Sequence, residues 1–236
     1  MRNIVYLYPS LLNGLTILLG TAAGAAFSRV PPRIRETALQ GAGLFVLLLG
    51  AQMALHMARP LNALLAMALG AAVGEGLNLE AGISRLAGWA KKRLGGTATA
   101  EAFVASAILF DVGALAIVGS IQAGLGQTPV LLLTKSVLDG ISAVLLSATL
   151  GWGVAASAPL TALYEGSVTV LAGPLVPVFR PTVLQDFDVV GGLIVSAIGI
   201  GFIWRPPPLK VVTLLPALPL AVILGWAGAW LHITFL

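Results

Sequence analysis

Four ionisable residues lie inside long apolar stretches of a chain in which 9% of residues are charged. They are Asp111, Lys135, Asp139 and Glu165. A charge at the centre of a bilayer costs about 2.5–3.5 kcal/mol or more, so such residues normally face a polar cavity, pair with one another or bind an ion. Three acids stand against one base, and this excess of negative charge predicts a site for a cation or a proton.

Lys135 and Asp139 are four residues apart and therefore share one face of a helix. A structural explanation for this pair is a buried ion pair that neutralises itself and fixes helix packing. It leaves Asp111 and Glu165 unpaired, and a desolvated carboxylate either takes up a proton or holds a cation. We therefore expect these two acids to carry the coupling ion, with Asp139 tuned by Lys135. Lys135 is alternatively a ligand for an anionic substrate, because a buried lysine readily changes its charge state.

Neutral oxygen atoms would complete the coordination of a hard cation such as Na⁺. Asn13 is the strongest candidate, and the outer candidates are Ser106, Ser136, Gln122 and Glu75. Serines in membrane helices more often bond back to a carbonyl one turn earlier, which is the alternative for both serines. Glu75, flanked by glycines at the expected end of a helix, is a candidate gate. The remaining acids, Glu80, Asp186 and Asp188, are expected at solvated helix ends.

Several classes of chemistry lack their residues in this chain. There is no cysteine, which excludes disulfides, thiolate metal sites and cysteine nucleophiles. His56 and His232 stand alone, and no zinc signature, serine triad or phosphate-binding loop is present. An intramembrane aspartyl enzyme would need Asp111 and Asp139 to share a proton. The positive charge of Lys135 favours the ionised carboxylates and so argues against this chemistry. We expect no enzyme activity, no cofactor beyond Na⁺ or H⁺ as coupling ion, and no metal other than Na⁺ at the same carboxylates.

The composition is that of a polytopic membrane protein, with 58% hydrophobic residues and 28 glycines. Backbone groups that face lipid must be satisfied internally, so we predict an all-α transmembrane bundle without strands. Eight apolar runs are long enough to cross a bilayer: 9–28, 39–57, 61–78, 102–125, 130–155, 158–178, 187–205 and 209–233.

The basic residues lie in short loops and form no nucleic-acid-binding face, but they predict orientation. With the N-terminus outside, the cytoplasmic loops hold Arg29, Arg33, Arg35, Arg85, Lys91, Lys92, Arg93, Arg205 and Lys210, against Arg2, Arg59 and Arg180 on the other side. This asymmetry favours eight crossings, surrounded by membrane lipids, with both termini outside. Residues 79–94 form either an amphipathic helix on the cytoplasmic surface or a solvated linker.

A weak internal repeat relates the two ends of the chain. An offset of 152 residues places Asn13 on Glu165, an offset of 149 places Gly43 on Gly192, and an offset of 148 places Leu61 on Leu209. Residues 1–78 would thus correspond to 158–236, with a central helix pair at 102–155, all within one transmembrane domain of residues 1–236. The two copies would cross in opposite directions, which makes the repeat inverted.

Inverted repeats place substrate and ion sites near the midplane on broken helices. Asn13, Asp139 and Glu165 are each followed by glycine, which permits a break but equally permits close packing, as we expect for Gly20 and Gly24. The leading prediction is a homodimeric secondary transporter, coupled to a cation or proton, for a small solute or ion. The alternatives are a cation channel and a membrane scaffold or partner protein whose charges only lock helix packing.

Several runs resemble a bacterial membrane family called domain of unknown function 554. They are residues 103–120, Thr134 to Asp139 and Tyr164 to Gly166, with Asn13-Gly14 and Gly74-Glu75 upstream. The resemblance covers nearly the whole chain, although the family often has an uncharged residue where this chain has Asp111. It implies a multi-pass inner-membrane protein of transporter type, and the activity must be argued from the site.

Overall fold

The computed structural model describes residues 6–26, 31–82, 85, 98–204 and 209–230, which contain helices and no strand. The longer helices are α2 (Tyr8–Ala26), α3 (Pro32–Ala54), α4 (Pro60–Gly76), α6 (Ala98–Asp111), α7 (Ala114–Gly124), α8 (Val130–Leu150), α9 (Ser157–Val170), α11 (Pro181–Ile203) and α12 (Ala217–Trp230). Short turns of helix are η2 (Gly151–Ala156), α10 (Ala172–Leu175) and η3 (Val211–Leu214). The all-α prediction is confirmed for this part of the chain. Most of the predicted surface helix at 79–94 lies outside it.

Within the described residues, five helical stretches are long and apolar enough to cross a membrane, or six if the bent pair α6 and α7 counts as one span. The five are Tyr8–Ala26, Glu36–Ala54, Val130–Val170, Pro181–Ile203 and Val211–Gly228. Helix α4 is apolar too but has only 17 residues. Three of the eight predicted runs explain the difference from five: α4 is too short, the run at 102–125 is the bent pair, and Val130–Val170 takes in two runs as one stretch.

The 41-residue stretch Val130–Val170 turns back on itself. A straight helix would separate Lys135 from Glu165 by about 45 Å at 1.5 Å per residue. The two side chains instead lie 3.3 Å apart, so the chain reverses between α8 and α9. The reversal occurs in η2, which begins at Gly151 with a φ of 81°, a left-handed conformation that favours glycine. This reversal brings Glu165 to α8.

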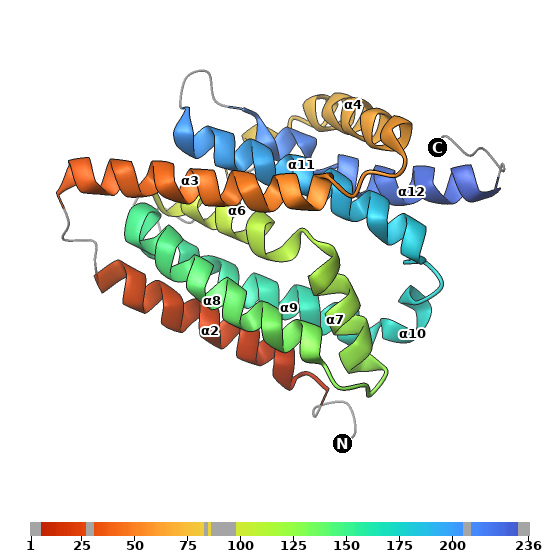
Figure 1. The fold of residues 1–236 in the computed structure, drawn as a ribbon, viewed down its shortest axis with the longest axis horizontal. Helices are drawn as coiled ribbons and strands as arrows, with labels where there is room; N and C mark the ends of the chain where they lie inside the picture. Colours follow the sequence, from red (N-terminus) through yellow and green to blue (C-terminus); the bar gives the residue numbers. More distant parts are fainter. Residues whose placement is uncertain (1–5, 27–30, 83–84, 86–97, 205–208, 231–236) are drawn as a thin grey trace. The chain divides into compact units, whose positions relative to one another are not determined.

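The described residues form two compact units, each built from segments far apart in the sequence. Unit 1 comprises residues 1–42 and 86–176, and unit 2 comprises residues 43–85 and 177–236. In unit 1, α2 packs along α8 and also contacts α9, as Figure 1 shows. In unit 2, α4 packs against both α11 and α12.

Glycines permit the close approach of α2 to α8 in unit 1. A Cβ added at Gly20 would strike the carbonyl oxygen of Gly140, and one at Gly24 would strike Ser147 and the carbonyl oxygen of Val144. The packing role expected for Gly20 and Gly24 is confirmed. Because the backbones are so close, the polar side chains on the facing sides of these helices must meet.

The helix that carries Asp111 breaks directly after it. Helix α6 ends at Asp111 and α7 begins at Ala114, with extended backbone at Gly113 and a bend of 59° between the two helices. The interruption leaves the last carbonyl groups of α6 without the next turn of helix. Asp111 therefore stands at a helix end inside an apolar segment.

Unit 2 contains a second set of glycine contacts. Gly43 and Gly50 of α3 lie against Gly199 and Gly192 of α11, respectively, so the two helices cross in antiparallel fashion. A Cβ at Gly70 would be 2.6 Å from Cβ of Ala217, and one at Gly74 would strike the carbonyl oxygen of Thr213. Helix α4 thereby packs closely against the segment that enters α12.

Candidate functional site

Side chains from α2, α8 and α9 meet in one buried cluster in unit 1. We call Asn13, Lys135, Asp139 and Glu165 the acid cluster; each is buried, and Glu165 is 0% exposed. The residues come from three helices, and only Lys135 and Asp139 are near each other in the sequence. The structure therefore brings together four of the five principal candidates from the sequence.

The amide of Asn13 bridges the two acids of the cluster. Its Nδ2 donates a hydrogen bond of 2.9 Å to Oδ2 of Asp139 and one of 2.8 Å to Oε1 of Glu165. The hydroxyl of Thr16, one turn further along α2, lies 2.8 Å from the carbonyl oxygens of both Asn13 and Ser136. These contacts hold the Asn13 side chain between α8 and α9.

Lys135 is shared between both acids. Its Nζ forms an ion pair with Oδ2 of Asp139 and lies 3.3 Å from Oε1 of Glu165. The predicted pairing of Lys135 with Asp139 is therefore confirmed, but the expectation that Glu165 stands unpaired was wrong. The i, i+4 spacing shows only neighbours on the same helix, whereas the reversal at η2 places Glu165 within reach of the flexible lysine stem.

Asp111 is the third acid near this cluster. It is close enough to Lys135 and Asp139 to interact with both electrostatically, and it faces Thr161 of α9. Its Oδ1 is buried and has no hydrogen-bond partner among the described residues. One lysine thus stands against three carboxylates, as the sequence predicts.

Four buried oxygen atoms around the acid cluster have no partner in the described part of the chain. They are Oδ1 of Asn13, Oδ1 of Asp111, Oγ1 of Thr161 and Oε2 of Glu165. Buried polar atoms are almost always hydrogen-bonded, so each of these oxygens requires an explanation. All four accept hydrogen bonds or coordinate cations, and the arrangement suits an added cation or proton.

Thr161 was not identified from the sequence. It lies four residues before Glu165 and so shares its face of α9, which is the signal that points to it. Threonine is common in membrane helices, where its hydroxyl usually bonds to its own helix. Here Oγ1 of Thr161 is buried and has no such bond.

The outer candidates do not join the acid cluster by any hydrogen bond in the described residues. The hydroxyl of Ser106 donates to the carbonyl oxygen of Ala102 at 2.7 Å, and that of Ser136 donates to Leu132 at 2.9 Å. Both serines are therefore satisfied within their own helices, the alternative that the sequence left open. Gln122 lies on α7, and its side chain makes no hydrogen bond to the cluster.

Glu75 lies in unit 2, where its exposed carboxylate forms an ion pair with Lys210 at 2.5 Å. This hydrogen bond raises the pKa of the Lys210 amine, so Lys210 remains charged over the physiological range. Glu75 is therefore part of a solvated pair at the end of α4.

A second buried polar cluster lies in unit 2 and consists of Arg59, Asn62 and Asp186; we call it the arginine cluster. Arg59 pairs with Asp186, its Nε lies 3.1 Å from Oδ1, and the amide of Asn62 donates to Oδ2. Asp186 is 5% exposed, so the expectation of a solvated helix end was wrong for it. The reason is that Arg59, just before α4, reaches the first turns of α11 and compensates the charge.

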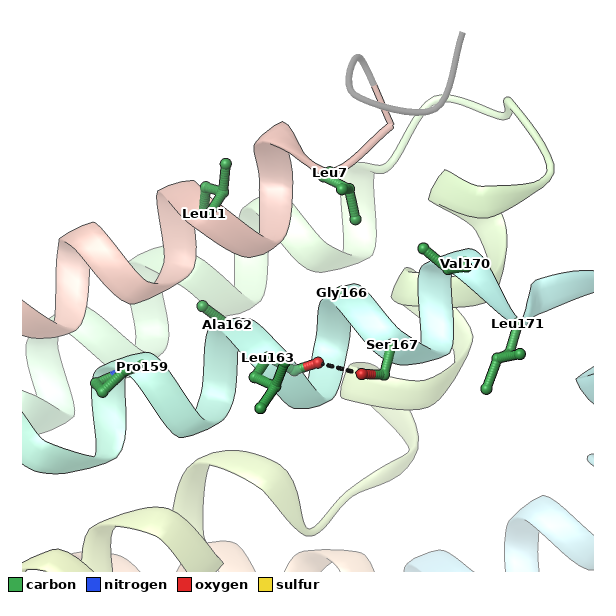
Figure 2. A pocket seen from close by; sticks show the side chains of 9 residues that line it. All are labelled: Leu7, Leu11, Pro159, Ala162, Leu163, Gly166, Ser167, Val170 and Leu171. Carbon is green, nitrogen blue, oxygen red and sulfur yellow. Dashed lines mark hydrogen bonds between the residues drawn. The ribbon is translucent and has the colours of Figure 1, made fainter. Parts of the chain in front are cut away.

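An open apolar groove of about 780 Å³ lies between α2 and α9. Leu7 and Leu11 line one side, while Leu163 and Val170 line the other (Figure 2). The polar side chain in the groove is Ser167, whose hydroxyl donates to the carbonyl oxygen of Leu163 at 2.6 Å. The groove offers hydrocarbon surface, and a charged ligand would find no partner there. No group of three His, Cys, Asp or Glu side chains arranged to hold a metal occurs in the described residues.

The comparisons with known proteins agree with the resemblance. The model of a family described as "Protein of unknown function (DUF554)" matches residues 8–226. The "Uncharacterized membrane protein YdfK" of Bacillus subtilis (strain 168) is 26% identical over 218 residues, which cover 90% of this chain and 93% of the relative. The "Uncharacterized protein YqgA" of Escherichia coli (strain K12) is 30% identical over 227 residues, 93% of this chain and 95% of the relative. No solved structure matches the chain.

Proposed function

The chain belongs to the DUF554 family, and on the geometry of the acid cluster we propose that it is a secondary transporter coupled to a cation or a proton. It is a membrane protein, as the apolar helices and the named relative indicate. The observation that carries the proposal is the buried excess of acid: three carboxylates near one lysine, with partnerless oxygens on Asp111 and Glu165.

Charge balance supports transport over a purely structural role. A buried carboxylate without compensation is costly, and a cluster that only locked helices would be more stable with equal numbers of acids and bases. An ion that binds at the acid cluster would neutralise it and lower the cost of exposing the site to the opposite side of the membrane. Asn13, Asp139 and Glu165 would bind this ion, and Asp111 would supply further negative charge.

The glycine contacts support the finer architecture that we propose, an inverted repeat with eight crossings. Gly43 lies against Gly199 and Gly50 against Gly192, and an offset of 149 residues exchanges these two contacts. Asn13 and Glu165, related by the offset of 152, bond directly to each other. A pseudo-twofold relation within each unit would produce such reciprocal contacts. The loop charges support an orientation with both termini outside, and the inner membrane is our proposal from the family resemblance.

Ion flux into proteoliposomes tests the proposal. The purified full chain is reconstituted, and uptake of radioactive sodium and of protons is followed under an imposed gradient. Asp139→Asn and Glu165→Gln should each abolish the flux that the unaltered protein shows. Glu75→Gln is the matched control, because it neutralises an exposed acid in unit 2. Unchanged flux in both cluster variants would remove the site from the mechanism.

The same vesicles separate a carrier from a channel. A carrier exchanges labelled ion inside for unlabelled ion outside and accumulates label transiently against its gradient, which a pore does not do. We expect such counterflow in the unaltered protein. Equilibration of the label without counterflow would favour the channel built from the same residues.

A further inference from the structure

The position of Lys135 points to the kind of ion that the proposed transporter accepts. Its ammonium group touches one oxygen of each acid, Oδ2 of Asp139 and Oε1 of Glu165. The amide of Asn13 donates to the same two oxygens. The two acids and the amide therefore form a cage, and the group that fills it belongs to the protein itself.

We infer that Lys135 is a tethered substitute for the transported ion, a small monovalent cation of the ammonium or alkali-metal type that enters the cage when the lysine leaves it. This inference rests on the proposed transport function and names the substrate class of the same site. In the structure described here the cage is closed by its own lysine.

The size of the Lys135 ammonium group argues against a bare proton as the ion that replaces it. When the Lys135 ammonium leaves, it vacates a space of its own size between two helices in a buried, closely packed region. Empty buried space forfeits packing contacts, and a proton does not fill it. An ammonium or alkali-metal ion fills the space and restores the charge that the lysine supplied. The exchange therefore replaces one positive charge by another.

The unpartnered oxygens supply ligands for the incoming cation and an acceptor for the displaced lysine. Oε2 of Glu165 and Oδ1 of Asn13 are fully buried and unpaired next to the cage, and they can coordinate an untethered cation. Asp111 already interacts electrostatically with Lys135, and its Oδ1 is free. Asp111 is thus the acid that receives the displaced lysine, which gives the third carboxylate a role.

Cation binding to the purified full chain in detergent tests the inference. Ammonium, sodium and potassium chloride are titrated at constant ionic strength against choline chloride, and the thermal midpoint and tryptophan fluorescence are recorded. Lys135→Gln should bind at least one of the three ions about tenfold more tightly, as expected if the lysine leaves the cage free about one tenth of the time. Asp111→Asn should weaken binding, because the displaced lysine loses its acceptor.

Two further variants keep the outcome decisive. Lys135→Gln combined with Asp111→Asn retains the summed formal charge of the acid cluster and Asp111 and leaves the cage intact, and it should also bind more tightly than the unaltered protein. This double variant replaces Lys135→Gln if the single variant does not fold. Lys210→Gln removes an exposed lysine in unit 2 and should leave cation binding unchanged.

The measurements distinguish a failure of the tethered-substitute inference from a failure of the transport proposal. Unchanged or weaker binding by both cage variants, with flux retained by the unaltered protein, overturns the tethered-substitute inference and leaves transport standing. Tighter binding in the variants, with no flux in the unaltered protein, supports the cage and overturns transport. Stabilisation by choline equal to that by the small cations also overturns the inference, because choline is too large for the cage.

Discussion

The acid cluster of unit 1 and the arginine cluster of unit 2 combine the same three kinds of side chain, a base, an amide and an acid. Each has a cationic side chain, an asparagine amide and a carboxylate, and in each the amide donates to a carboxylate. They differ in charge balance. Arg59 stands against Asp186 alone, and both oxygens of that carboxylate are bonded. Lys135 is shared by two acids with Asp111 as a third, and several oxygens remain unbonded.

This difference separates a structural ion pair from a candidate site. Arg59 also lies 2.9 Å from the carbonyl oxygen of Thr182, so its planar guanidinium is anchored at several points. Lysine presents a single ammonium on a flexible stem, which can leave its partners without breaking a fixed geometry. The arginine cluster therefore fastens α4 to α11, while the acid cluster keeps unbonded oxygens for the cation that we propose.

Removing the charge pair from each cluster should separate their roles most clearly. Lys135→Met with Asp139→Leu should reduce ion flux by about 100-fold or more, the equivalent of losing about 3 kcal/mol of site energy. Arg59→Met with Asp186→Leu should retain flux, because a balanced buried pair is replaceable by apolar side chains of similar volume. Flux in proteoliposomes at equal protein content is the measurement. Equal losses in both double variants would abolish the distinction between the clusters.

Breaking the arginine cluster on one side should destabilise the fold strongly. Arg59→Ala leaves the Asp186 carboxylate buried without its cation, which costs about 3–5 kcal/mol. The thermal midpoint in detergent should fall clearly for Arg59→Ala. It should fall much less for the double variant Arg59→Met with Asp186→Leu. A single variant as stable as the unaltered protein would show that Asp186 is solvated, contrary to the structure.

The close contact of α2 with α8 should matter for the acid cluster. Gly20→Ala places a methyl group against the carbonyl oxygen of Gly140, and such overpacking costs about 1–3 kcal/mol. It should also lower flux, because α2 carries Asn13. Gly173→Ala is the matched control in unit 1, since a Cβ there meets no atom within 4 Å. Thermal midpoints and flux of the two variants check this prediction, and equal behaviour would contradict it.

The smallest effect is expected at the exposed pair of Glu75 and Lys210. Lys210→Gln should leave the thermal midpoint and the flux at pH 7 within error, because solvent screens exposed pairs. Glu75 raises the pKa of Lys210, so the pair's contribution is complete below the ordinary lysine pKa of 10.5 and is lost as the pH rises through the raised value. A midpoint that changes near neutral pH in this variant would show that the pair contributes more than the structure indicates.

Local sequence patterns predicted the parts of the site that depend on one helix. The four-residue spacing of Lys135 and Asp139 predicts their contact, because helical periodicity alone places them together. The internal repeat relates Asn13 to Glu165, and in the structure their side chains form a hydrogen bond. Sequence patterns did not indicate Thr161 or the contact of Lys135 with both acids, because both depend on how α9 returns along α8. Asp186 was misjudged, because its compensating Arg59 is 127 residues away.

Composition and residue spacing alone predict that the chain is helical and apolar, that it belongs in a membrane, and that acids outnumber bases within its apolar stretches. These properties follow from composition and from the need to satisfy backbone groups within each lipid-facing segment. Which of these charges are compensated follows instead from the folded arrangement of the helices. The reversal at η2 gives Glu165 a share of Lys135, and the packing of α4 against α11 supplies Asp186 with Arg59. Compensation requires contact within a few ångströms, and helix packing, not sequence spacing, sets those distances.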